Sequence, residues 1–139
     1  MQGGRTRDGA GILLFLVLAY GIASLVHFVH NAVYLREYPN MPASITATTV
    51  YGAWLAVAAT GCVGYGLYRW GWHRIGLLVV AIYAAFGFAG LDHYTLAPPS
   101  AHSVVMNVTI LCEFVAALIL FLFAARGLFI QARGASRAA

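Results

Sequence analysis

Charged side chains are scarce in this sequence: only 9% of the residues are Asp, Glu, Lys or Arg, and lysine is absent. Soluble domains carry about 25% charged residues, so this chain lacks the polar surface that a water-exposed fold needs. Its 62% of hydrophobic residues and its mean hydropathy of +0.82 agree with that deficit. These values exclude an ordinary soluble enzyme or binding domain, and they predict an integral membrane protein.

Cysteine is also rare. Cys62 and Cys112 each lie inside an apolar run, and the sequence contains no CxxC spacing. We interpret both as small buried hydrophobic residues rather than as a disulfide or a metal-binding pair.

Four apolar runs are each long enough to cross the hydrocarbon core of a membrane, which takes ~20 residues of helix. They cover about residues 9–34, 45–68, 75–96 and 104–130. Backbone groups in lipid must be hydrogen-bonded within their own segment, so each run is predicted to be a helix. Ser44 and Ser100 are the expected N-caps of the second and fourth helices. We therefore expect residues 1–139 to form a single all-α domain, an antiparallel bundle of four transmembrane helices.

The arginines predict how this bundle is oriented. When the chain is laid out as four antiparallel helices, seven of the eight arginines fall on one side and only Arg36 falls on the other. By the positive-inside rule both termini are cytoplasmic, in a multi-pass protein of the plasma or inner membrane. Because the arginines flank apolar runs instead of forming one patch, we expect the lipid bilayer as the partner and no nucleic acid.

Small residues recur every four positions in two of the predicted helices. They are Gly52, Ala56, Thr60 and Gly64 in the second helix, and Ala81, Ala85 and Ala89 in the third. Such stripes let helix backbones approach closely in lipid, which predicts a tight hairpin of these two helices. The same stripes would also serve a homo-oligomer or a larger membrane complex, and the sequence does not choose between these uses.

Polar side chains gather near one end of the first, third and fourth helices. The first helix carries two histidines in "LVHFVHN", the third ends in "GLDHY", and the fourth places a carboxylate in line with a histidine. A rise of ~1.5 Å per residue gives these groups overlapping heights in the membrane. Exposing them to lipid is costly, so we expect them to face the bundle interior and to converge. The converging residues are His27, His30, His93 and Glu113.

Imidazole and carboxylate are ligands that suit zinc, copper or iron. We therefore predict a transition-metal site that opens to the extracytoplasmic side and serves metal handling or metal-dependent redox chemistry. The four converging residues are the predicted ligands, with His102 as an additional or entry ligand.

Other interpretations stay open at this stage. One is a b-type haem with His27 and His93 as axial ligands, although haem does not need the nearby carboxylate. Another is a non-enzymatic accessory subunit of a larger membrane complex, in which the polar residues lock the core. A lipid-modifying enzyme would use Glu113 and the histidines as acid and base. The sequence leaves open whether the protein is an enzyme.

Overall fold

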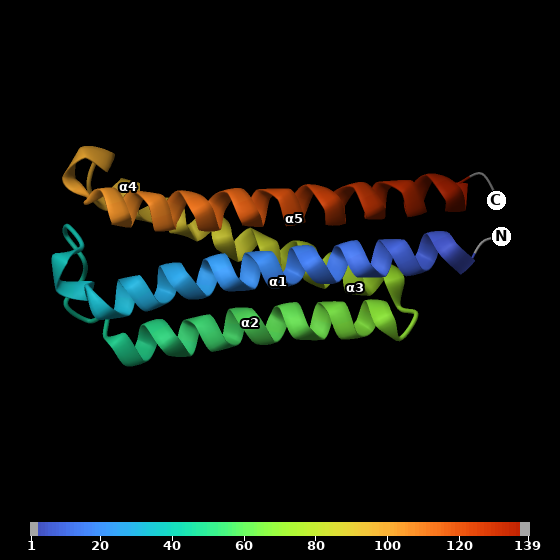
Figure 1. The fold of residues 1–139 in the computed structure, drawn as a ribbon, viewed down its shortest axis with the longest axis horizontal. Helices are drawn as coiled ribbons and strands as arrows, with labels where there is room; N and C mark the ends of the chain where they lie inside the picture. The colour runs from blue at the N-terminus through green and yellow to red at the C-terminus, as the bar shows by residue number, and fades with distance from the viewer. Residues whose placement is uncertain (1–2, 137–139) are drawn as a thin grey trace.

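The computed structural model describes residues 3–136 and is all-helical, with the long helices lying along a common axis (Figure 1). These helices are α1 (Gly3–Val33), α2 (Ala47–Arg69), α3 (His73–Phe86) and α5 (Val104–Ser136). A 3₁₀ segment, η2 (Gly87–Asp92), and the short α4 (His93–Leu96) continue α3. Two further 3₁₀ turns are η1 (Leu35–Glu37) and η3 (Pro99–Ala101).

Within the described residues, four segments are long and apolar enough to cross a membrane. They are Gly9–Val33, Ala47–Arg69, His73–Leu96 and Val104–Gly134. The four helices predicted from hydropathy are thus confirmed. Many large apolar side chains on the outside of the bundle are exposed, such as Phe15, Leu55 and Val104, as expected for helices that contact lipid.

The two ends of the bundle differ in what they contain. One end holds the connections of residues 34–46 and 97–103, and we call it the loop end. At the other, α1 begins, α5 ends, and α2 turns into α3 through residues 70–72 (Figure 1). Arg69, Arg74, Arg126 and Arg133 lie toward this second end, which we call the basic end.

The third membrane segment is less regular than predicted. It changes from α-helix to 3₁₀ helix at Gly87 and returns to α-helix at His93. Packing explains why a glycine begins this stretch: a Cβ atom at Gly87 would lie 2.5 Å from Cβ of Ala117 and 2.7 Å from Cε2 of Tyr20. The segment therefore approaches α1 and α5 more closely there than a side chain allows.

The hairpin of α2 and α3 forms, but it buries only some of the small residues predicted for it, Gly64 and Ala81 among them. Gly61 and Gly64 are the buried glycines of α2, and Cβ atoms there would lie 2.8 Å from the Tyr83 ring and 2.9 Å from Val80. Of the predicted stripe on α2, Gly52 and Ala56 are exposed. In the third segment Ala81 is buried, whereas Ala85 and Ala89 are exposed. The stripes are thus only partly used for packing within the chain.

Three smaller predictions need correction. Cys62 and Cys112 are free and exposed on the outside of the bundle, where an apolar thiol contacts lipid as readily as protein. Helix α2 is capped by Thr46, not Ser44, through a reciprocal pair of hydrogen bonds with Thr49. At the start of α5, Ser103 rather than Ser100 accepts a hydrogen bond, from the backbone N–H of Met106.

Candidate functional site

A small cavity of about 140 Å³ lies between α1, the α3–η2–α4 segment and α5, in the half of the bundle toward the loop end. Three of the residues singled out by the sequence line it: His27 from α1, His93 from α4 and Glu113 from α5. His27 is 2% exposed and Glu113 is 1% exposed. The remaining lining residues are Phe28, Asn31, Phe86, Ala89 and Gly90.

His27 and Glu113 face each other across this cavity without a hydrogen bond. Nε2 of His27 lies 3.7 Å from Oε2 of Glu113, and that oxygen is buried with no hydrogen-bond partner. Buried polar atoms normally have a partner, because an unsatisfied one costs about 1–3 kcal/mol. The pair is therefore incomplete as a hydrogen-bonding unit.

The partners of His27 fix the tautomer of its ring. Nδ1 lies 3.4 Å from Oγ1 of Thr109, whose hydroxyl donates its one hydrogen to the carbonyl oxygen of Met106. Thr109 can then only accept from the ring, so Nδ1 of a neutral His27 carries the hydrogen. Nε2 is left with its lone pair directed toward Glu113. Nε2 of His27 and the carboxyl group of Glu113 thus face each other in a buried place with no hydrogen bond between them.

His93 joins the cavity from the short helix α4. Its ring centroid lies 5.4 Å from that of His27, and its Nε2 lies 3.1 Å from Nδ2 of Asn31, which donates to it. Oδ1 of Asn31 is buried without a partner. Gly90, one turn before His93, keeps space open, because a Cβ atom there would lie 3.2 Å from Oε2 of Glu113.

His30 and His102 do not line the cavity, and both lie around Tyr38 instead. The Tyr38 hydroxyl and Nδ1 of His30 are 2.9 Å apart, and the Tyr38 ring packs 4.8 Å from that of His93 and 6.4 Å from that of His102. Burial raises the pKa of Tyr38 to about 12, so its phenol is neutral in the hydrogen bond that it forms with His30 at neutral pH. One ring nitrogen of His30, Nδ1, is therefore occupied by the hydrogen bond with Tyr38.

His102 is buried although it belongs to the connection before α5. Its Nδ1 lies 3.1 Å from the carbonyl oxygen of Pro98, to which it donates, and its Nε2 is buried without a partner. The ring lies 6.3 Å from that of His93. His102 thus presents an acceptor without a partner near His93.

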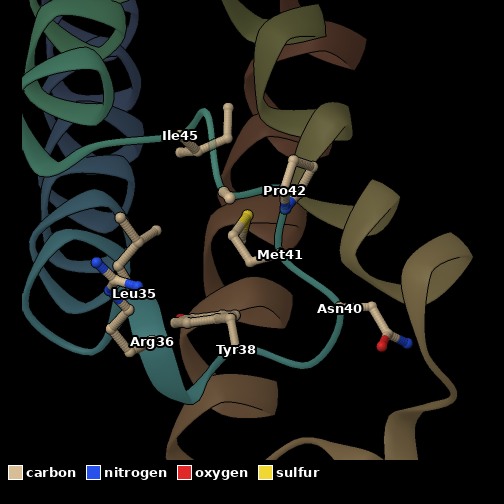
Figure 2. A pocket seen from close by; sticks show the side chains of 8 residues that line it. Leu35, Arg36, Tyr38, Asn40, Met41, Pro42 and Ile45 are labelled. Atoms are coloured by element: carbon tan, nitrogen blue, oxygen red, sulfur yellow. The ribbon is translucent and has the colours of Figure 1, made fainter.

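Tyr38 is the site residue that the sequence interpretation missed. It follows α1 in the loop-end connection, and Figure 2 shows this connection folding around a second cavity, of about 290 Å³, that Tyr38 and Met41 line. Tyr38 contacts His93 and also packs with Met106 and Ile110 of α5. A pattern search had little chance of finding it, because its position depends on the turn at η1 and Pro39.

Within the described part of the chain, no group of three or more His, Cys, Asp or Glu side chains is arranged to hold a metal ion as it stands. His27 and Glu113 have the spacing of two ligands, and His93 lines the same cavity but is turned to Asn31. Asp92 is exposed and does not line the cavity.

Comparisons with known proteins leave the function to be argued from this geometry. The chain matches no family model, no curated protein sequence and no solved structure.

Proposed function

We propose that this chain is an integral membrane protein that binds a transition-metal ion between α1, α4 and α5, with His27, Glu113 and His93 as ligands. One observation carries the proposal: Nε2 of His27 and Oε2 of Glu113 face each other at 3.7 Å in a buried place, and that oxygen has no hydrogen-bond partner. A cation between the two atoms would take both as ligands. The lining of the cavity is thus suited to a positively charged occupant.

The spacing of the two atoms supports a metal ion in particular. Nitrogen and oxygen ligands lie about 2.0–2.2 Å from zinc, so two of them are about 3.4 Å apart at a tetrahedral angle and farther apart at wider angles. The observed 3.7 Å falls in that range, whereas it is too long for a hydrogen bond. Thr109 accepts from the other ring nitrogen of His27, which is how metal-binding histidines are commonly held.

His93 becomes the third ligand if its ring turns away from Asn31. The cavity of about 140 Å³ and the absence of a side chain at Gly90 give room for that movement. The same small volume favours a bare ion over haem, because pockets for larger ligands measure about 300–1,000 Å³. Imidazole and carboxylate leave copper, zinc and iron as candidates.

The arginines support an extracytoplasmic site. Four of the arginines whose side chains are described lie toward the basic end and only Arg36 lies at the loop end. By the positive-inside rule we propose that the basic end and both termini are cytoplasmic. In a plasma or inner membrane, the site then takes its ion from the extracytoplasmic side. His102, with its unpartnered Nε2, and His30 flank the route from the loop end.

Metal content with paired variants tests the proposal. Purified wild-type protein offered copper, zinc or iron should hold about one ion per chain, as one shared ligand set implies. Loss of a hydrogen bond that supports a ligand lowers metal affinity about 10- to 100-fold. Glu113→Gln and His27→Ala each remove a ligand itself, so each should lower metal affinity by more than that. The controls are Asp92→Asn, an exposed carboxylate, and His73→Ala, a histidine at the basic end. Wild-type protein that binds none of these ions sinks the proposal.

A structural clasp in an accessory subunit is the second candidate, and specific hydrogen bonds favour it. Asn31 with His93, Tyr38 with His30, and Tyr94 with Asn107 each join different elements at the loop end. In that case the wild type stays metal-free in the experiment above. Replacing Asn31 with Ala would then lower stability by about 1 kcal/mol, while no variant would change metal content.

A further inference from the structure

A large cavity lies at the basic end, far from the histidines. It measures about 610 Å³ and is formed by α2, α3 and α5. Tyr68, Leu77, Phe123 and Ile130 provide apolar walls, and Arg126 and Gln131 complete the lining. This volume is within the about 300–1,000 Å³ typical of ligand pockets.

The depth of this cavity matches the boundary between hydrocarbon and headgroups. Arg126 follows Val104, the first residue of α5, by a helical length of about 33 Å, close to the ~30 Å thickness of the hydrocarbon core. Phe123 lies nearly one turn deeper in the core, whereas Gln131 lies more than one turn farther out. The cavity therefore extends from the apolar region to the polar interface.

A second cavity, of about 510 Å³, continues this one on the polar side. The two share Gln131, and the second is lined by Trp72 of the α2–α3 turn and by His73 and Arg74 at the start of α3. Arg74 donates from Nη2 to the backbone oxygen of Gln131 at 3.0 Å, which fixes its position between α3 and α5. Among the side chains that the structure describes, no carboxylate forms an ion pair with Arg74 or Arg126.

We propose that the two cavities together bind one anionic phospholipid. Its phosphate lies at Arg126 and Arg74, and an acyl chain runs along Tyr68, Leu77 and Phe123. Charge complementarity selects the headgroup, because two arginines without a described carboxylate partner face an interface that anionic lipids occupy. The apolar walls select a lipid over a soluble phosphate, since only a lipid covers them on binding.

Lipid retention by the purified full chain tests this site. Native mass spectrometry in detergent would compare phosphatidylglycerol with phosphatidylcholine of the same acyl chains. We expect the wild type to retain phosphatidylglycerol preferentially, and Arg126→Gln to weaken that retention about fivefold, as expected for one arginine near an anionic headgroup. Arg133→Gln is the matched control, because Arg133 packs on Phe129 and lines neither cavity.

A second pair of variants tests the acyl chain. Ile130→Trp fills the larger cavity and should reduce retention of both lipids, whereas Leu122→Trp, on an exposed position outside the cavity, should not. Soluble glycerol phosphate in excess should fail to displace the lipid. Equal retention of the two lipids, equal effects of Arg126→Gln and Arg133→Gln, or displacement by glycerol phosphate would each overturn the proposal.

Discussion

The interior of the bundle differs between its two halves. Toward the basic end it is filled by close apolar packing, with Leu13, Val17 and Ala124 buried among neighbours and Gly76 and Gly127 in direct contact with other helices. From mid-bundle to the loop end the interior is polar. Among the described residues, all the buried side-chain nitrogen and oxygen atoms without a hydrogen-bond partner lie in this second half. They are Tyr20 Oη, Ser24 Oγ, Asn31 Oδ1, His102 Nε2 and Glu113 Oε2.

This difference assigns separate roles to the two halves. In lipid there is no hydrophobic driving force for helices to associate, because the acyl chains are as apolar as the side chains. Close apolar packing is therefore what holds a bundle together there. Unsatisfied acceptors such as Oε2 of Glu113 lower stability, and a fold keeps them where they serve a function. We therefore expect substitutions in the basic half to act on stability, and substitutions in the loop half to act on binding.

The largest expected effect is on packing in the basic half. Gly76→Ala places a Cβ atom 2.5 Å from the backbone nitrogen of Tyr68, which cannot move without shifting α2. We expect the free energy of unfolding in detergent to fall by about 3 kcal/mol, as overpacked cores commonly show. Gly66→Ala is the control, because nothing lies within 4 Å of its Cβ position. It should be neutral or slightly stabilising, since Ala favours helix over Gly. Equal stability of the two variants would contradict the assignment of roles.

A smaller effect of opposite sign is expected in the loop half. Glu113→Gln supplies an amide N–H that can donate to Nε2 of His27, where the wild type has no hydrogen bond between the two side chains. In metal-free protein we expect the variant to be about 1–2 kcal/mol more stable than the wild type by denaturant unfolding. The same variant should lose metal binding. A destabilised Glu113→Gln would mean that the carboxylate serves the fold rather than an ion.

The sequence predicted the membrane segments well because the solvent imposes a simple requirement. Lipid demands apolar helices of a given length, and hydropathy alone reports that length. The predicted positions of the helix ends were less accurate. The actual caps, Thr46 and Ser103, lie two or three residues from Ser44 and Ser100, because several hydroxyl side chains stand near each helix start. Such choices depend on local hydrogen bonds that composition does not record.

The candidate site could be predicted only in part for a related reason. Helical periodicity placed His27 and Glu113 on inward faces, and both line the same cavity. The orientation of His93 depends on the 3₁₀ segment before it, which arises from packing of Gly87 against Tyr20 and Ala117 and has no signature in hydropathy. The hydrogen bond that occupies His30 comes from Tyr38 in a loop without periodicity.

The smallest effect concerns Tyr38, which tests whether the phenol is buried among the histidines of the loop half. Tyr38→Phe removes the hydroxyl that is hydrogen-bonded to His30 while keeping the ring against His93, so stability at neutral pH should fall by about 1 kcal/mol. Burial raises the pKa of Tyr38 to about 12, from 10.0 in the unfolded chain. The stability that the neutral phenol contributes is therefore complete below pH 10.0 and is lost as the pH rises through about 12. The wild type should therefore lose its advantage over Tyr38→Phe within this range and become the less stable of the two toward pH 12, because this rise in pKa is worth roughly 3 kcal/mol. If the two instead keep a constant difference up to pH 12, Tyr38 ionises as freely in the fold as outside it, and its burial among the histidines would be wrong.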